Sequence, residues 1–254
     1  MIDTHSHVLF GVDDGAQTLE ESIEMLKVAQ ADGLTKVINT SHSVPGIKFE
    51  NDTTRLRNIY DQVVDEMQRQ ELTVELVNGS EIMLTPLALE WLHDHKVQTI
   101  NDTSWVLVEI PWNKNLLFDI DEDQALAKVK EMGYRILIAH PERYPQVQNN
   151  YAKLAQWQSL GYAFQINRTS LFDNNLEIIL NLAWRMLDDG YCDVIGTDAH
   201  KFTGMRVNKL QDIYDILAQK YGTEEAQRLI INNPQRLIDG VELTKRTTIK
   251  TSEV

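Results

Sequence analysis

The sequence predicts an α/β fold in which a parallel sheet forms a closed or distorted barrel wrapped by helices. Short β-branched apolar runs alternate about seven times with amphipathic helical stretches, and this alternation is typical of a parallel sheet covered by helices. Seven such units in about 240 residues suit one barrel better than two domains. Because no Ser/Gly-rich linker or change in composition divides the chain, we expect a single domain over residues 1–243.

Seven strands are expected along this domain. Each is a short apolar run rich in Val, Ile or aromatic residues, and such runs favour buried strands. The runs are Met1–Thr4, Lys36–Thr40, Val74–Val77, Trp105–Ile110, Arg135–Ala139, Ala163–Ile166 and Cys192–Gly196.

Helices are expected between the strands, where apolar residues recur at spacings of three and four. In Leu19–Ala31, for example, Ile23 and Leu26 share a face, and Asp32-Gly33 is a stop signal. The other stretches are Thr53–Arg69, Pro86–His95, Asp121–Glu131, Tyr151–Ser159, Leu176–Asp188, Val207–Lys220 and Glu224–Ile231, the last followed by Asn233-Pro234. Residues 244–254 are polar and without apolar periodicity, which predicts a loose tail.

The composition excludes several classes of protein. The 254 residues hold 24 Lys and Arg against 38 Asp and Glu, a net charge of −14, which argues against a nucleic-acid-binding or anionic-membrane-binding surface. No apolar run approaches the roughly 18 residues that span a bilayer, and the N-terminus shows no signal-peptide pattern. The single cysteine, Cys192, cannot form an intramolecular disulfide, which fits a reducing cytoplasm.

Metal-ligating residue types gather at the expected C-terminal ends of the strands, where parallel barrels carry their active sites. Five of the seven histidines lie there with several acidic residues. The candidate ligands are His5, His7, His42, Glu81, Glu109, His140, Asp198, His200 and one of Asp13 and Asp14. The remaining histidines, His93 and His95, lie two residues apart in an expected helix, so their side chains diverge and we expect them at the surface.

Two short motifs have metal-ligand spacing. In an extended strand His5 and His7 point to the same side, and Asp198 and His200 do the same, because side chains alternate with period two. Imidazole nitrogen and carboxylate oxygen suit Zn, Mn or Fe. Since one ion takes roughly four to six ligands, about nine candidates indicate two or three ions that share a carboxylate.

These motifs also resemble a known family. DTHSH, TSHSVPG, GSE, the strand-end Glu109, AHPER and TDAH occur in the order found in the polymerase-and-histidinol-phosphatase (PHP) superfamily. Within it, MIDTHSHVLFGVDDGAQTLEESIEM is similar to the bacterial protein-tyrosine phosphatases of the CpsB/YwqE group, which act beside capsule and exopolysaccharide gene clusters. The resemblance covers residues 1–239. It implies a seven-stranded distorted (β/α) barrel and a centre of three divalent ions, usually manganese.

The resemblance also implies which residues hold each ion. One ion would take His5, His7, Glu81 and Asp198, and Glu81 would bridge to a second ion held by Glu109 and His140. The third would take Asp14, His42 and His200, with Asp13 as the competing choice for Asp14. After His42 the chain departs from the family pattern, because Ser43-Val44-Pro45 stands where relatives often carry a basic residue or His.

Two arginines match family residues that bind phosphate. Arg143 lies three residues after His140, and its guanidinium fork suits phosphate oxygens; the alternative is a surface ion pair with Glu142. Arg206 matches the second arginine, with a spacing from His200 about one residue longer than the family pattern. Trp112, just beyond Glu109, is a candidate for stacking on an aromatic group of a substrate.

The resemblance implies a metal-dependent protein-tyrosine phosphatase that acts on the phosphotyrosine-rich tail of a bacterial tyrosine kinase controlling polysaccharide export. Cys192 has no HCxxxxxR phosphate loop around it, so cysteine-based phosphatase chemistry is excluded. Three alternatives stay open: a histidinol-phosphate phosphatase, a phosphodiesterase or nuclease, and a non-catalytic metal-binding module. The DDG loop after His7 favours the tyrosine phosphatase, the net charge disfavours the nuclease, and the complete ligand set disfavours the non-catalytic module.

Overall fold

The computed structural model describes residues 1–111, 120–172 and 176–246. The seven expected strands are confirmed to within two residues at each end. Two short strands, β3 and β5, were not predicted. The strands are β1 (Ile2–Ser6), β2 (Lys36–Asn39), β3 (His42–Ser43), β4 (Glu75–Val77), β5 (Glu81–Met83), β6 (Trp105–Glu109), β7 (Arg135–Ala139), β8 (Ala163–Asn167) and β9 (Val194–Gly196).

The expected helices are also present. The α-helices are α1 (Leu19–Ala31), α2 (Thr53–Arg69), α3 (Pro86–His93), α4 (Glu122–Glu131), α5 (Pro145–Asn149), α6 (Ala152–Ser159), α7 (Glu177–Asp188), α8 (Gln211–Tyr221), α9 (Thr223–Gln227) and α10 (Asn233–Ile238). Short 3₁₀ turns are η1 (Ile100–Asp102), η2 (Pro141–Arg143) and η3 (Arg168–Leu171), and η4 (Arg228–Asn232) is a π-helical segment.

Two helical predictions need correction, and one short helix was not predicted. Helix α8 begins at Gln211 rather than Val207, because Asn208 is buried and donates hydrogen bonds to Asp3 and Ser6. The chain stays helical through Pro234, which occupies the first turn of α10, where a missing N–H costs nothing. Helix α5 has no periodic apolar pattern in its five residues and was not predicted.

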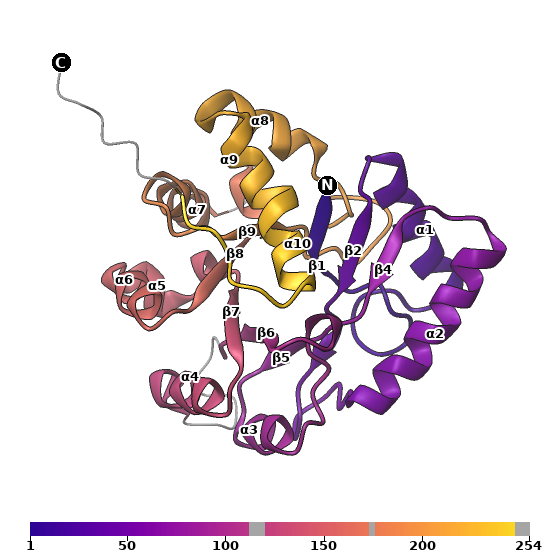
Figure 1. The fold of residues 1–254 in the computed structure, drawn as a ribbon, viewed down its shortest axis with the longest axis horizontal. Coiled ribbons are helices and arrows are strands. Elements are labelled where there is room, and N and C mark those ends of the chain that lie inside the picture. The colour runs from indigo at the N-terminus through magenta and orange to yellow at the C-terminus, as the bar shows by residue number, and fades with distance from the viewer. Residues whose placement is uncertain (112–119, 173–175, 247–254) are drawn as a thin grey trace.

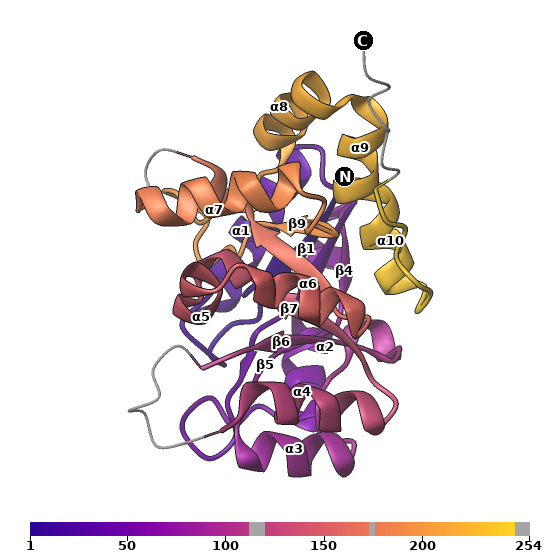
Figure 2. The same cartoon turned by 90° about the vertical axis from the view of Figure 1, so that its left-hand side faces the viewer.

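The strands form two parallel sheets that together make a distorted barrel. Their orders are β1-β2-β4 and β3-β5-β6-β7-β8-β9. The chain runs directly from β2 into β3 and from β4 into β5, so each of these pairs acts as one interrupted strand. The open edges meet where His7 N donates to Ala199 O and Asp198 N donates to His5 O, both at 2.8 Å. Figures 1 and 2 show the helices arranged around the outside of these strands.

Side-chain alternation along the strands produces two apolar cores. On β6, Val106 and Val108 belong to the core between strands and helices, whereas Trp105 and Leu107 lie in the inner core. Leu237 of α10 joins this inner core at the end of the barrel. The same alternation turns the next inward position on β6, Glu109, into the barrel at the C-terminal end of the strand.

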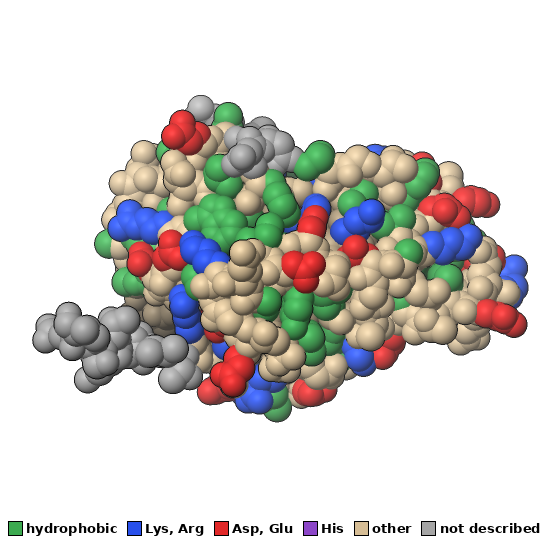
Figure 3. Space-filling model, turned by 90° about the horizontal axis from the view of Figure 1, so that it is seen from above, with side chains coloured by type: hydrophobic (Ala, Val, Ile, Leu, Met, Phe, Trp, Pro, Cys, Tyr) green, Lys and Arg blue, Asp and Glu red, His purple; other side chains and the backbone are tan. Residues whose placement is uncertain are grey.

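The surface of the molecule is mixed in charge. On the face drawn in Figure 3, acidic and basic side chains lie scattered among apolar ones. Among the described residues, the structure has no helix long and apolar enough to cross a membrane.

The first residues after 243 lie against the barrel. The side chain of Asn233 accepts a hydrogen bond from Thr244 N, and Lys245 forms an ion pair with Asp193. Residues 247–254 of the expected tail lie outside the described residues, and the division at residue 243 stays a prediction.

Gly196 of β9 packs tightly against β1, and this contact generates a prediction. A Cβ atom at Gly196 would lie 2.6 Å from His5 Cβ and 3.0 Å from His5 N. Gly196→Ala should therefore lower the free energy of unfolding by about 1–3 kcal/mol through overpacking, measured by urea denaturation. The control Lys27→Ala removes an exposed ion pair with Glu24 and should change it by less than about 0.5 kcal/mol. Equal midpoints for the two variants would contradict this account of strand closure.

Candidate metal centre

Nine side chains converge at the C-terminal ends of the barrel strands. They reach this position from six separate parts of the chain, and their ligand atoms fall into overlapping groups whose members lie within 4.8 Å of one another. The nine are His5, His7, Asp14, His42, Glu81, Glu109, His140, Asp198 and His200. The structure thus brings together every ligand expected from the sequence, whereas His93 and His95 are exposed at the end of α3, as expected.

Glu81 lies at the centre of the group and is fully buried. Its Oε1 lies 2.9 Å from His140 Nε2. Its Oε2 lies 3.1 Å from His42 Nδ1, 3.3 Å from His5 Nε2 and 3.4 Å from His7 Nε2. Glu81 is also a member of two of the groups of potential ligands, so it could be shared between two ions.

Asp198 forms a second meeting point. Its Oδ1 lies 3.6 Å from His5 Nε2 and 3.5 Å from both His7 Nε2 and His200 Nδ1. His5 and His7 therefore face Glu81 and Asp198 together. This arrangement follows from the parity of β1, which turns the first and third residues of the His-Ser-His segment to the same side.

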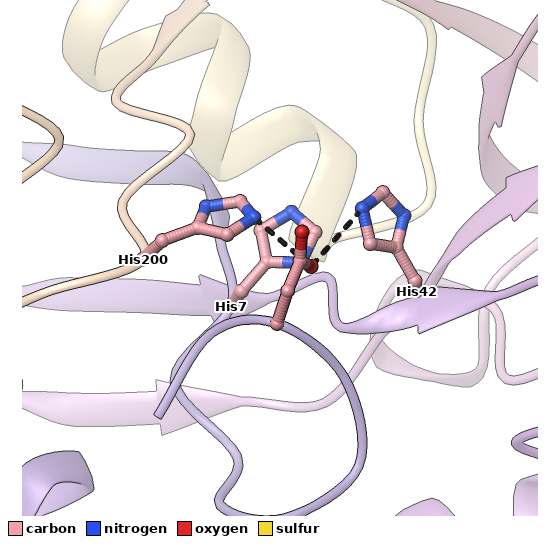
Figure 4. A group of neighbouring side chains, drawn as sticks. His7, His42 and His200 are labelled. Atoms are coloured by element: carbon pink, nitrogen blue, oxygen red, sulfur yellow. Dashed lines mark ion pairs between the residues drawn. The ribbon is translucent and has the colours of Figure 1, made fainter. Parts of the chain in front are cut away.

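The outermost part of the cluster is formed by His42, His200 and Asp14. Asp14 Oδ1 lies 3.4 Å from His200 Nε2 and 3.6 Å from His42 Nε2, and the Asp14 side chain is 54% exposed. Figure 4 shows His7 between His200 and His42, each carried by a different segment of the chain. The cluster therefore opens to solvent on the side of Asp14.

Asp13 has a different position from Asp14. It is buried, and its carboxylate accepts hydrogen bonds from His7 Nδ1 at 2.9 Å, from His42 N at 2.7 Å and from Gly15 N at 2.9 Å. The Nε2 atom of His7 is thereby left to face the cluster. Such a carboxylate behind an imidazole fixes the tautomer and orientation of a metal ligand. The geometry therefore favours Asp14 over Asp13 as the ligand.

Two supporting residues on β8 were not predicted. Gln165 Oε1 lies 3.0 Å from His5 Nδ1, and Asn167 donates from Nδ2 to Asp198 Oδ2 at 2.8 Å. Both are buried, and they are bonded to each other. Their signal in the sequence is two amide side chains at alternate positions of an otherwise apolar strand, which places them on the inward face.

Both candidate phosphate-binding arginines lie beside Asp198. Arg143 Nη1 lies 3.2 Å from Asp198 Oδ2, and Arg206 Nη2 lies 2.6 Å from Asp198 Oδ1. The structure thus brings Arg206 to the cluster despite its longer spacing from His200. Glu142, the alternative partner of Arg143, is buried and accepts a hydrogen bond from the backbone N of Asn167. Trp112 lies outside the described residues.

The ionisation of the cluster reflects burial and crowding. Burial opposes charge on Glu81 and Asp198, but the surrounding imidazoles, with His5 first among them, and the Arg206 guanidinium beside Asp198 together outweigh it and hold the pKa of both carboxyls well below their usual range. Burial and the adjacent Glu81 raise the pKa of Glu109. Burial and the neighbouring His7 lower the pKa of His200 to about 4, which keeps its imidazole neutral and able to coordinate a cation near neutral pH.

The donor set fits divalent transition metal ions. Glu81 Oε2, Glu109 Oε2 and His42 Nδ1 are buried and make no well-formed hydrogen bond. Buried polar atoms in proteins normally have partners, and cations would satisfy all three atoms at once. A mixture of imidazole nitrogen and carboxylate oxygen suits Mn, Fe or Zn better than a site made of oxygen alone.

Comparison with known proteins shows the family to which this chain belongs. The family model for "Capsular polysaccharide synthesis, CpsB/CapC" matches residues 1–239. The chain belongs to this family. The tyrosine-protein phosphatase CpsB of Streptococcus pneumoniae is 29% identical over 243 residues, 94% of this chain and 98% of that protein. The tyrosine-protein phosphatase YwqE of Bacillus subtilis is 26% identical, over 88% of this chain and 86% of that protein.

Solved structures show a similar fold within and beyond the CpsB/CapC family. A crystal structure from work on YwqE of B. subtilis and CpsB of S. pneumoniae, described as unique metal-dependent tyrosine phosphatases, aligns with a TM-score of 0.87 at 26% identity over 97% of both chains. The histidinol phosphate phosphatase of Lactococcus lactis aligns with a TM-score of 0.54 at 14% identity over 90% of this chain and 94% of that one. The second likeness shows a shared fold alone, and together they confirm the expected distorted PHP barrel.

The position of Asp13 in this CpsB/CapC chain generates a prediction. Asp13→Asn keeps one acceptor oxygen but turns the other into an N–H donor, so at least one of the three N–H groups loses its acceptor. The variant should bind Mn²⁺ about 10- to 100-fold more weakly, with an unchanged circular dichroism spectrum. Calorimetric titration of the metal-free protein measures this. Asp65→Asn, at an exposed position on α2, is the matched control. Wild-type affinity in Asp13→Asn would exclude the positioning role.

Proposed function

We propose that this chain is a metal-dependent protein-tyrosine phosphatase. One observation carries the proposal: nine potential metal ligands converge beside two partly exposed arginines at the mouth of the barrel. Support comes from relatives named tyrosine-protein phosphatases, which match almost the whole chain. The proposed reaction is hydrolysis of a phosphate monoester.

The proposed cofactor is a set of three divalent ions, with Mn²⁺ favoured and Fe or Zn as alternatives. Their proposed ligands are those implied by the motif match. His5, His7, Glu81 and Asp198 would hold the first ion, Glu81, Glu109 and His140 the second, and Asp14, His42 and His200 the third. The spatial grouping supports the third set, which His7 joins, and it places His5 and His7 with Asp198. It differs for the second set, because His140 and Glu81 lie with His5, whereas Glu109 and Glu81 lie with His42.

The reaction divides between the ions and the side chains of the chain. Bound divalent ions supply Lewis acidity and an activated water nucleophile. Arg143 and Arg206 are 22% and 40% exposed, so their guanidinium groups can turn from Asp198 toward phosphate oxygens entering from solvent. They neutralise charge that develops on the phosphoryl group. The departing phenolate has a pKa near 10, so it needs less protonation than an alkoxide.

The proposed substrate is the phosphotyrosine-rich tail of a bacterial tyrosine kinase that controls capsular or exopolysaccharide synthesis. The family description links these proteins to capsular polysaccharide synthesis. A cytoplasmic site of action is part of the proposal, and the buried free thiol of Cys192 supports a reducing compartment.

Removal of metal tests the chemistry. Dialysis against excess EDTA should abolish hydrolysis of a phosphotyrosyl peptide, and added Mn²⁺ should restore it better than Mg²⁺, because imidazole-rich sites suit softer ions. Phosphate release and metal content per chain are measured together. Histidinol phosphate is assayed in parallel and should be the poorer substrate. Full activity in EDTA after time for exchange would rule out the metal mechanism.

Arg143 tests the binding of phosphate separately from metal. Arg143→Ala should reduce turnover by about 100-fold or more, the range for loss of one preorganised donor, while metal content stays the same. Arg143→Lys should recover little, because a point charge does not reproduce a bidentate contact. Arg206→Ala should show a similar or smaller loss. If steady-state kinetics of Arg143→Ala match those of the wild type, Arg143 has no part in binding phosphate.

A further inference from the structure

Phe49 occupies an unusual backbone conformation next to the cluster. Its φ angle is +52°, in the left-handed region that a bulky side chain rarely adopts. The surrounding loop holds it there, because Phe49 O accepts hydrogen bonds from Val44 N at 3.1 Å and Asn51 N at 2.7 Å. Asn51 in turn donates from Nδ2 to His42 O at 2.7 Å. Strain of this kind persists where surrounding contacts fix it, and it concentrates at functional sites.

This conformation places the ring of Phe49 against a candidate metal ligand. The rings of Phe49 and His42 are parallel within 3°, with centroids 5.9 Å apart. His42 belongs to the outer part of the cluster beside the half-exposed Asp14. Phe49 is itself only partly buried, and the exposed Lys48 places Nζ 4.3 Å from its ring centroid. The ring therefore lies where the cluster meets solvent, in contact with His42 and with the side chain of Lys48, which is exposed and can move aside.

A second apolar segment lies on the other side of the cluster. His42 and His200 flank His7 (Figure 4), with ring centroids 6.2 Å from each other. The loop after His200 carries Phe202 and Met205, 37% and 53% exposed, immediately before Arg206. Exposed large apolar side chains beside a polar site are typical of a surface that binds an apolar group.

We propose that Phe49 forms the wall of a subsite for the aromatic ring of the phosphotyrosyl substrate. The inference rests on the proposed function and extends it to the choice between aryl and alkyl phosphates. With the phosphoryl group held at the cluster by Arg143 and Arg206, the rest of the substrate extends toward the mouth, where Phe49 lies. Offset or edge-to-face packing of two aromatic rings adds affinity that an alkyl chain does not obtain.

A purely structural role for Phe49 makes a different prediction. If the ring only shields and orients His42, its removal weakens metal binding and affects all phosphate ligands alike. If the ring contacts substrate, its removal affects only ligands that carry an aromatic group, and metal content is unchanged. The two roles are therefore separated by a pair of ligands that differ in the ring alone.

The experiment compares phenylphosphonate and methylphosphonate, which are not hydrolysed, as ligands of the Mn²⁺-loaded protein. Calorimetry measures the two dissociation constants for the wild type, Phe49→Leu and Phe49→Tyr, with metal content determined for each. Leu keeps apolar bulk and the same backbone strain without a ring, and Tyr keeps the ring. Phe49→Leu should weaken phenylphosphonate about 3- to 10-fold and leave methylphosphonate unchanged, whereas Phe49→Tyr should keep the preference for the phenyl ligand.

Two results would overturn the subsite. Either equal affinities of Phe49→Leu and wild type for phenylphosphonate, or a parallel loss for both ligands with lower metal content, assigns Phe49 no contact with substrate. Wild-type hydrolysis of a phosphotyrosyl peptide is assayed separately. Failure of that assay rejects the proposed function, whereas the phosphonate pair tests the subsite through binding alone.

Discussion

The backbone of Asp198 closes the barrel, and its side chain links His5 and His7 to the two candidate phosphate-binding arginines. Its N–H donates to His5 O at the junction between the first and last strands. Its carboxylate then meets His5, His7, Arg143 and Arg206. The residue reaches these partners with a φ angle of +54°, which Asp tolerates better than most residues. The same residue therefore closes the sheet and brings the members of the cluster together.

The buried acids of the cluster are tolerable only because other buried groups hold them in place. Burial of an isolated carboxylate costs free energy. Here the buried ligands are held by further buried polar side chains behind them. Asp13 lies behind His7, Gln165 behind His5, and Asn167 behind Asp198. Since these supports come from β8 and from the loop after β1, they tie the strands on both sides of β9 to the same group of ligands. The fold thus preorganises the ligands before any cation binds.

Much of this arrangement could be predicted from local rules. The period-two alternation of side chains along a strand orients His5 and His7, and the rule that active-site residues lie at strand ends places Glu109. The positions of all three residues can therefore be predicted from a single sequence. The short strands β3 and β5 were not, because two or three residues next to polar ends give no periodic signal. The choice between Asp13 and Asp14 depends on which neighbour points inward, and the left-handed conformation of Phe49 depends on a surrounding loop. Such features are set by tertiary contacts rather than by residue type.

The charge of the site sets a condition on binding phosphate. Four of the nine candidate ligands are carboxylates, and two guanidiniums lie beside them. With the imidazoles neutral, as metal ligands must be, these groups sum to two negative charges and repel a phosphate dianion. Two divalent cations reverse that sign, and a third strengthens the attraction. The positive charges of Arg143 and Arg206 are therefore too few to attract phosphate until bound cations neutralise the carboxylates. Binding of metal and binding of phosphate at this cluster are consequently coupled.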